Sequence, residues 1–189
     1  MIYQLVTMLE QWLPRSQPGR TMAEDDWLPT ASATGLLDGG EAMISVEGTT
    51  LVDRPVGEVW NFIAEVSNTP KWDTGIVEAV RTSDGPDGVG MTVRAVSRVG
   101  SREQVLNVVV SEYEPGRSLG LRFDTKFGKV RVHHGFEATG AQTKLTKTTE
   151  MWPTGFFRLI QPIIRRRLQK IEIEVDLGNV KRLLETEGS

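Results

Sequence analysis

The sequence predicts an α+β fold in which a curved antiparallel sheet of seven strands wraps around one long C-terminal helix. Three observations lead to this prediction. Residues 156–187 form the only long segment with helical periodicity. Most of residues 43–152 alternate apolar and polar side chains in short runs that turn signals separate. The helix is amphipathic, so its apolar stripe must pack against one face of the sheet.

The composition is that of an ordinary soluble globular protein. A chain of 189 residues with 39% hydrophobic and 25% charged side chains can form one domain with an extension. The net charge of −3 argues against general nucleic-acid binding, which usually needs a basic surplus. Cysteine is absent, which excludes disulfides and thiolate metal sites. No run approaches the roughly 18 apolar residues of a membrane span. The mean hydropathy of −0.25 favours a soluble, cytoplasmic protein.

Residues 1–41 are predicted to be an N-terminal extension, and residues 42–189 the globular domain. Apolar residues recur at helical spacing near the start and indicate a short amphipathic helix: Ile2, Leu5, Val6, Leu9 and Trp12. This segment lacks the basic start and the uninterrupted apolar core of a secretory signal. Pro14, Pro18 and Gly19 then indicate the beginning of a linker.

The domain is expected to begin with a strand and two short helices. Alternation over residues 44–52 predicts the strand. Asp53 is expected to cap the helix that follows, with Pro55 at an early helical position. An i, i+3, i+4, i+7 stripe continues this helix to about residue 66. The Asn-Thr-Pro run at 68–70 is a second helix-start or turn signal.

Six further strands are predicted after these helices. Each is a run of alternating apolar and polar residues between turn residues such as glycine, proline and aspartate. The predicted runs cover residues 76–81, 91–98, 103–113, 118–124, 130–136 and 143–151. The run from Leu119 to Phe123 alternates most regularly, which is typical of a half-buried strand.

The C-terminal helix carries a long apolar stripe. Its members lie three or four positions apart: Phe157, Ile160, Ile164, Leu168, Ile171 and Val175, extended by Val180, Leu183 and Leu184. Pro162 fits only near a helix start, which leaves residues 155–161 open to a separate turn. Arg165, Arg166 and Arg167 make the outer face of the first half basic. That face is either simply solvated or a patch for a membrane surface or nucleic acid.

The order of the elements and two motifs resemble a known family. The first motif is Asp53-Arg54-Pro55-Val56-Gly57-Glu58-Val59-Trp60-Asn61-Phe62-Ile63 with Asn68-Thr69-Pro70-Lys71-Trp72-Asp73, and the second is Tyr113-Glu114-Pro115-Gly116-Arg117-Ser118-Leu119. Both are similar to stretches of the START/Bet v 1-like (SRPBCC) superfamily, and specifically of its polyketide cyclase/dehydrase and lipid-transport members. The resemblance covers residues 42–187 and implies the helix-grip fold. It leaves the function open, because the superfamily spans carriers, cyclases, receptors and oxygenase subunits.

One face of the sheet is expected to meet the helix and to line a cavity. The alternation assigns these side chains to it: Met91, Val93, Ala95, Leu119, Leu121, Phe123, Val132, His134 and Phe136. The predicted ligand-binding residues are Trp72, Met91, Val93, Ala95, Leu121, Phe123, Val132, His134, Phe136, Met151, Ile160 and Ile164. An apolar pocket with few polar groups suits a hydrophobic ligand. The alternative is that the same side chains fill the interior and leave no cavity.

His134 is the candidate catalytic residue. Near neutral pH an imidazole can act as a general acid or base, or can orient a ligand carbonyl. A purely structural role is the alternative, and the neighbouring His133 is expected to face outward. His134 and Glu137 point to opposite faces of a strand and no third ligand is evident, so no metal site is predicted. The sequence has no phosphate loop, dinucleotide motif or zinc signature, and no cofactor is expected.

The last predicted strand has two possible registers. In one, Lys147 and Thr149 enter the cavity as polar groups. In the other, Thr146, Thr148 and Glu150 turn inward instead. Threonine suits either face, so the sequence leaves both registers open.

Three functions are compatible with these observations. The first is a carrier or sensor that binds a small hydrophobic ligand such as a lipid, an isoprenoid or a polyketide. The second is a polyketide cyclase or dehydratase in which His134, Lys147 and Glu150 assist proton transfer. The third is an interaction protein that uses the N-terminal segment and Arg165–Arg167. We expect a small hydrophobic ligand as the partner, no nucleic acid and no membrane span, and we leave a homodimer open.

Overall fold

The computed structural model describes residues 43–99 and 101–186. They form a seven-stranded sheet in the order β1-β7-β6-β5-β4-β3-β2, in which every neighbouring pair is antiparallel. The strands are β1 (Ile44–Val52), β2 (Ile76–Arg81), β3 (Thr92–Val99), β4 (Arg102–Glu114), β5 (Ser118–Thr125), β6 (Gly128–Thr139) and β7 (Gln142–Pro153). The predicted sheet is confirmed. The extension predicted over residues 1–41 lies outside the described residues.

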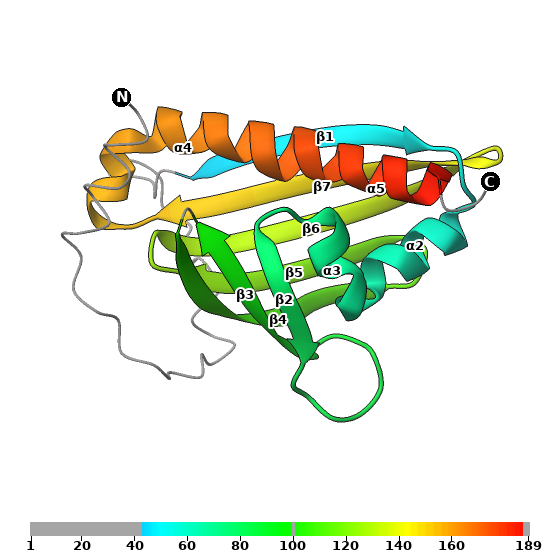
Figure 1. The fold of residues 1–189 in the computed structure, drawn as a ribbon, viewed down its shortest axis with the longest axis horizontal. Coiled ribbons are helices and arrows are strands. Elements are labelled where there is room, and N and C mark those ends of the chain that lie inside the picture. Colours follow the sequence, from blue (N-terminus) through cyan, green and yellow to red (C-terminus); the bar gives the residue numbers. More distant parts are fainter. Residues whose placement is uncertain (1–42, 100, 187–189) are drawn as a thin grey trace, which may run out of the picture. The chain divides into compact units, whose positions relative to one another are not determined.

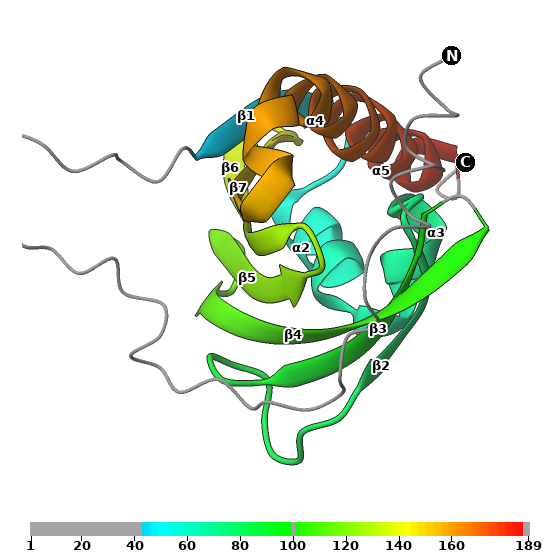
Figure 2. The same ribbon diagram turned by 90° about the vertical axis from the view of Figure 1, so that its left-hand side faces the viewer.

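Helical segments occur between β1 and β2 and again after β7. The first group is α2 (Val56–Ala64), a 3₁₀ turn (Val66–Asn68) and α3 (Thr69–Trp72). The second group is a 3₁₀ helix (Gly155–Ile160), α4 (Gln161–Leu168), a π-helical segment (Gln169–Val175) and α5 (Asp176–Thr186). In Figure 1, α4 and α5 form one rod along β1 and β7. Figure 2 looks along this rod and shows the sheet curving beneath it, with α2 and α3 on the concave side. This is the predicted helix-grip arrangement.

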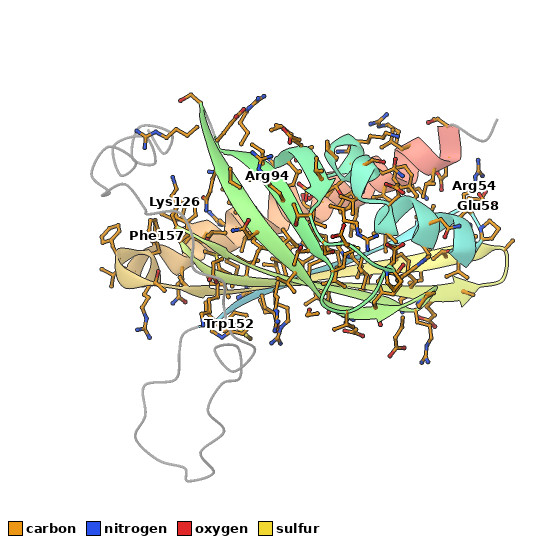
Figure 3. All side chains as sticks on the ribbon, turned by 90° about the horizontal axis from the view of Figure 1, so that it is seen from below. Arg54, Glu58, Arg94, Lys126, Trp152 and Phe157 are labelled. Atoms are coloured by element: carbon orange, nitrogen blue, oxygen red, sulfur yellow. The ribbon has the colours of Figure 1, made fainter. Side chains whose placement is uncertain are left out.

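The start of α2 differs from the prediction. Pro55 occupies the N-cap position in an extended conformation, and no side chain accepts a hydrogen bond there. Asp53 therefore does not cap the helix, because the extended ψ of Pro55 (149°) makes Pro55 the N-cap and Val56 the first helical residue. The Asp53 amide instead donates to Glu185 Oε1 at 2.9 Å, which ties the start of α2 to the end of α5. Figure 3 labels Arg54 and Glu58 at this exposed start, where they form an ion pair at 3.7 Å.

The C-terminal helix changes phase in its middle. The predicted stripe places Val175 on the buried face, but Val175 is 39% exposed and Ile173 is 2% exposed. The prediction for Val175 is therefore wrong. The physical reason is the π-helical segment, whose i→i+5 hydrogen bonds widen the turn and rotate the residues that follow. This rotation turns Asp176 and Leu177 toward the sheet at the start of α5.

Gly48 allows the π-helical segment to approach β1 closely. A Cβ atom at this position would lie 2.0 Å from Cγ2 of Ile173, far inside van der Waals contact. Gly48 pairs with Lys147 across β1 and β7. The absence of a side chain at Gly48 therefore brings the helix against the sheet at the level of Lys147.

Two adjoining groups of buried side chains fill the concave side. The main core consists of Val46, Val52, Val59, Trp60, Ile63, Trp72, Met91, Val93, Ala95, Leu106, Val108, Val110, Leu119, Phe136, Leu145, Ile173, Leu177 and Val180. The smaller group, with Ile164 of α4 packed against it, consists of Ile44, Val130, Val132 and Met151. Leu121, Phe123 and Leu168 contact both groups and join them. The helix and the sheet are thus held together by continuous apolar packing.

Candidate functional site

β7 turns Lys147 and Thr149 toward the concave face of the sheet. Each of these residues is 1% exposed. Glu150 points to the opposite face, where it pairs with Arg131 at 3.4 Å. Arg131 also lies over the ring of Trp152, which Figure 3 labels on this outer side. The structure therefore decides between the two predicted registers, and Glu150 is not on the face where proton transfer was expected.

Lys147 and Asp176 form a buried ion pair between β7 and α5. Lys147 Nζ lies 2.9 Å from Asp176 Oδ2, and the two side chains are 2% and 0% exposed. The other carboxylate oxygen, Oδ1, accepts hydrogen bonds from the amide and the hydroxyl of Thr74, both at 3.2 Å. Such partners are needed because burying an ion costs on the order of several kcal/mol. The pair brings opposite charges together, so it adds no net charge to the interior.

His134 lies directly opposite Lys147 on the neighbouring strand β6. Burial lowers the pKa of His134 to about 3, and the charges of Lys147 and His133 act in the same direction, whereas a polar contact with the backbone of Leu119, which falls short of hydrogen-bond geometry, raises it. The imidazole is consequently neutral at neutral pH, with one nitrogen as a donor and the other as an acceptor. Its ring packs edge to face on Trp72 of α3, with 5.7 Å between ring centroids.

Four buried side-chain atoms in this region form no hydrogen bond with a described residue. They are Trp72 Nε1, both ring nitrogens of His134 and Thr149 Oγ1. Lys147 Nζ lies 5.5 Å from the centroid of the Trp72 ring, and Thr149 lies two residues further along the same strand face. We call Trp72, His134, Lys147, Thr149 and Asp176 the interior polar cluster. Because buried polar atoms nearly always have partners, the cluster has hydrogen-bonding capacity for another molecule.

Most of the predicted ligand-binding residues lie on the concave face. Eight are buried: Trp72, Met91, Val93, Ala95, Val132, His134, Phe136 and Met151. Four are half-buried: Leu121, Phe123, Ile160 and Ile164. They do not form one group, since Val132 and Met151 belong to the smaller buried group and Met91 and Val93 to the main core. Their contact with a ligand stays a prediction.

Asp176 and Thr74 belong to the site, but the sequence did not reveal them. Asp176 lies three residues after Ile173 and four before Val180, both of which are buried. This spacing places Asp176 on the same helix face as two apolar residues, and it could have predicted a buried aspartate. An acidic side chain on an apolar face needs a buried partner. The π-helical segment concealed it by shifting the face that an ideal α-helix would bury.

No group of three or more His, Cys, Asp or Glu side chains in residues 43–99 and 101–186 could hold a metal ion. Within the same described part of the chain, none of the helices has the length and apolar character that crossing a membrane requires.

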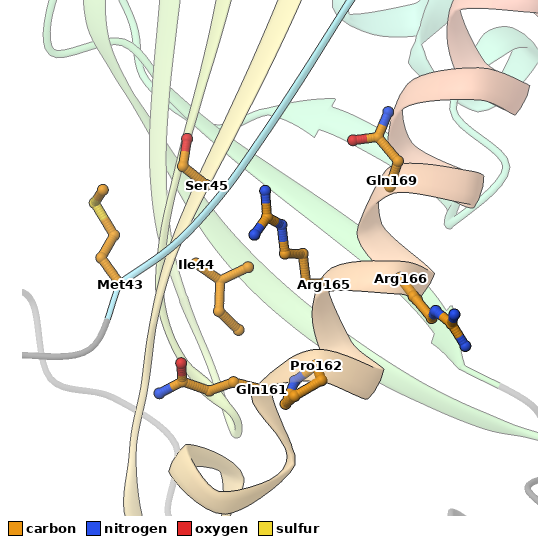
Figure 4. Close-up of a pocket in the computed structure, with 8 residues that line it drawn as sticks. All are labelled: Met43, Ile44, Ser45, Gln161, Pro162, Arg165, Arg166 and Gln169. Atoms are coloured by element: carbon orange, nitrogen blue, oxygen red, sulfur yellow. The ribbon is translucent and has the colours of Figure 1, made fainter.

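An open pocket of ≈ 500 Å³ lies between the start of β1 and α4 (Figure 4). Its lining residues are Met43, Ile44, Ser45, Gln161, Pro162, Arg165, Arg166 and Gln169. None of the predicted ligand-binding residues lines it. In Figure 4, Arg165 extends toward β1 and Arg166 points away from it. The pocket shares no residue with the interior polar cluster and is a separate feature.

Comparison with known proteins agrees with this architecture. The sequence matches the family model described as polyketide cyclase/dehydrase and lipid transport over residues 43–185. No curated protein matches the sequence.

Three solved structures illustrate the shared fold. Zhui aromatase/cyclase from Streptomyces sp. R1128 has 16% sequence identity and a TM-score of 0.68, over 78% of this chain and 97% of that one. The di-domain ARO/CYC StfQ from the steffimycin biosynthetic pathway has 14% identity and a TM-score of 0.66, over 78% of this chain and 52% of StfQ, so this chain spans about half of it. Ara h 8.0201 has 11% identity and a TM-score of 0.57, over 77% of this chain and 99% of that one. Identities this low show the fold alone, whereas the family model spans nearly the whole described domain. The chain belongs to the polyketide cyclase/dehydrase and lipid transport family of the SRPBCC superfamily.

Proposed function

We propose that this protein binds a small, uncharged, hydrophobic ligand between the concave face of the sheet and the C-terminal helices, as a carrier or sensor. The observation that carries the proposal is the set of four buried polar atoms on Trp72, His134 and Thr149 that form no hydrogen bond with a described residue. They lie beside an apolar face. A ligand with an apolar body and one polar group would match both features.

The polar group of the ligand can be specified from the donors and acceptors of the cluster. The indole N–H of Trp72 only donates, while the neutral His134 ring and the Thr149 hydroxyl can each donate and accept. A ketone or hydroxyl oxygen suits this set. Lys147 and Asp176 already neutralise each other at 2.9 Å. A charged ligand would add a buried charge without a counter-ion, which is costly.

The comparisons support the same class of ligand. The family description names both polyketide cyclases and lipid transport. Aromatase/cyclases occur among the structural neighbours. A polyketide, an isoprenoid or a lipid with a neutral polar group would match the donors and acceptors of the interior polar cluster.

The first test is mass spectrometry of the organic extract from gently purified protein, followed by calorimetric titration with 2-naphthol, a neutral aromatic alcohol. We expect an apolar compound near one equivalent, or binding of 2-naphthol. Thr149→Val should weaken that binding about fivefold, because it removes one hydrogen bond worth about 1 kcal/mol. Thr148→Val is the matched control, since the Thr148 hydroxyl donates to Glu47 on the outer face at 2.9 Å. An empty extract together with no binding of 2-naphthol would contradict the proposal.

A second candidate function is a cyclase-type enzyme. The observation that favours it is a neutral His134 directly opposite the ammonium group of Lys147. A neutral imidazole can accept a proton from a carbon between two carbonyls, although its lowered pKa makes it a weaker base than an ordinary histidine, and a nearby donor can stabilise the oxygen that the new carbon–carbon bond leaves behind. Ring closure would then release one water molecule.

The cyclase hypothesis is tested with a linear triketone whose ring closure produces ultraviolet absorbance. Wild-type protein should accelerate this change, His134→Leu should abolish the acceleration, and His133→Leu should retain it because His133 is on the outer face. Equal rates for wild type and His134→Leu would leave binding as the function.

A further inference from the structure

The start of the C-terminal helical rod exposes three large apolar side chains and several arginines. Phe156 and Leu159 of the 3₁₀ helix are 51% and 76% exposed, and Ile163 of α4 is 49% exposed. Large apolar side chains exposed side by side usually mark a surface that another molecule covers. We call Phe156, Leu159 and Ile163, together with Arg166 and Arg167, the rod-end patch.

The local geometry aligns these side chains within each of the two helical segments. Residues three apart are eclipsed in a 3₁₀ helix, so Phe156 and Leu159 point the same way. Phe157 between them is buried and stacks edge to face on Phe127, with 4.7 Å between ring centroids. In α4, Arg166 and Arg167 lie three and four positions after Ile163 and therefore on its face of the helix.

All charged side chains of this segment are positive. Residues 154–170 contain five basic side chains (Arg158, Arg165, Arg166, Arg167 and Lys170) and no acidic one, although the whole chain has a net charge of −3. Within the described residues none of the five forms an ion pair, whereas arginines on the sheet such as Arg94 and Arg98 do. Lys126 in the β5–β6 turn lies at the same end of the domain, as Figure 3 shows.

We propose that the rod-end patch docks this protein on an anionic lipid bilayer, with Phe156, Leu159 and Ile163 inserted at the headgroup level and the arginines on lipid phosphates. An apolar face flanked by basic residues is the pattern of interfacial helices. Anionic headgroups attract such a basic segment before the apolar side chains insert. The docking does not depend on what the interior polar cluster binds.

A bilayer fits this surface better than a nucleic acid does. Phosphate backbones would engage the arginines but would leave the three apolar side chains in water. A bilayer satisfies both components, because its surface offers negative charge and, just below it, an apolar layer. The proposal therefore requires that binding depend on both kinds of side chain.

The test is co-sedimentation of the full chain with vesicles. One set contains phosphatidylcholine alone, and the other contains phosphatidylcholine with about 30% phosphatidylglycerol, a fraction that produces a negative surface potential. We expect at least about tenfold more binding to the anionic vesicles, decreasing as the salt concentration rises. A chain that stays in the supernatant with both sets, or that binds both equally, overturns the proposal.

Two double variants separate the components of the patch. Leu159→Ser/Ile163→Ser and Arg166→Gln/Arg167→Gln should each weaken binding to anionic vesicles by about tenfold or more. The matched controls are Val80→Ser/Val105→Ser on β2 and β4, and Arg94→Gln/Arg117→Gln on β3 and in the β4–β5 turn. They change exposed side chains away from the patch and should bind like the wild type. Circular dichroism and thermal unfolding verify that all four variants fold.

The variants also exclude the alternatives. Wild-type binding by the apolar double variant would mean adsorption through charge alone and would overturn the insertion that we propose. Wild-type binding by both double variants would place the membrane contact elsewhere in the chain and would also overturn it.

Discussion

The two faces of strands β6 and β7 carry the same chemical groups in opposite environments. On the concave face, Lys147 pairs with Asp176 at 2.9 Å, and the side chains are 2% and 0% exposed. On the convex face, Lys144 pairs with Glu137 at 3.1 Å, and the side chains are 47% and 68% exposed. The distances are nearly equal, so solvent access rather than geometry distinguishes the pairs. Exposed pairs contribute about 0–1 kcal/mol, whereas an ion left alone in the interior is strongly destabilising.

The neighbouring histidines repeat this contrast. His134 is buried, and burial together with the Lys147 charge lowers its pKa to about 3. The His133 side chain is 41% exposed and lies 3.5 Å from Glu112. Alternation along one strand thus places two identical residues in very different degrees of solvent exposure. Each of the following predictions compares a concave position with a matched position elsewhere.

The largest effect is expected for Lys147→Met. This change leaves the Asp176 carboxylate buried without its ammonium partner, and we expect the free energy of unfolding to fall by about 3–5 kcal/mol. Lys144→Met, the control on the convex face, should cost less than about 1 kcal/mol. Urea unfolding measures both. Lys147→Met/Asp176→Leu should recover much of the loss, and equal stability of the two single variants would show that burial does not distinguish the pairs.

Gly48→Ala is expected to have the next largest effect. Its new Cβ would lie 2.0 Å from Ile173 Cγ2, so either the π-helical segment or β1 must move. We expect a loss of about 1–3 kcal/mol, the usual cost of overpacking. Gly178→Ala in α5 is the control, because nothing lies within 4 Å of its added Cβ. The control should be neutral or more stable by up to about 1 kcal/mol. A stable Gly48→Ala protein would mean that the helix and β1 can separate freely.

The pH dependence of stability should show the contribution of the buried His134. Its folded-state pKa of about 3 is below its ordinary value of 6.5, so between these pH values the unfolded chain binds a proton that the folded chain does not. The free energy of unfolding therefore rises with pH across this window and falls on acidification. From pH 7 to pH 5 we expect a loss of about 2 kcal/mol from this group.

His134→Leu should remove this part of the pH dependence, whereas His133→Leu should keep it. Urea unfolding of the wild type and both variants at pH 7, 6 and 5 measures the slopes. Parallel slopes for the wild type and His134→Leu would mean that His134 does not titrate as its burial requires.

The smallest effect on stability is expected for Thr149→Val. The hydroxyl of Thr149 forms no hydrogen bond with a described residue, so its replacement by a methyl group of similar shape should be neutral or stabilising within about 1 kcal/mol. Thr143→Val is the comparison, since the Thr143 hydroxyl donates to the Arg54 carbonyl at 2.8 Å. That variant should lose about 1–2 kcal/mol, because the carbonyl loses its donor. Thermal and urea unfolding measure the stability of both variants. Equal losses of stability would mean that the Thr149 hydroxyl has a partner in the protein.

Much of the fold could be predicted from local pattern. Period-two alternation identifies strands because side chains on a strand point to opposite faces in turn, as at Met91, Val93 and Ala95. The helix at the C-terminus was equally visible from its stripe. Two details could not be predicted. Asp53 looked like a helix cap, but Pro55 took that position, and the π-helical segment exchanged Val175 for Ile173 on the buried face.

The candidate site was predictable only in part. The sequence pointed to His134 and to one of two alternative sets of polar residues on β7, because alternation assigns faces relative to neighbours. It could not choose between the sets, since threonine occupies both faces and lysine or glutamate can be buried when paired.

The sequence by itself determined the number of strands, the C-terminal helix and the apolar character of the concave face, because these depend on residues close together in the chain. Only the tertiary structure decided that Lys147 turns inward and meets Asp176, 29 residues later. It also decided that Trp72 packs on His134 and that Gly48 brings the helix close. These contacts join segments far apart in the sequence. A single local pattern cannot specify them, because each requires two elements to be placed before either side chain has a partner.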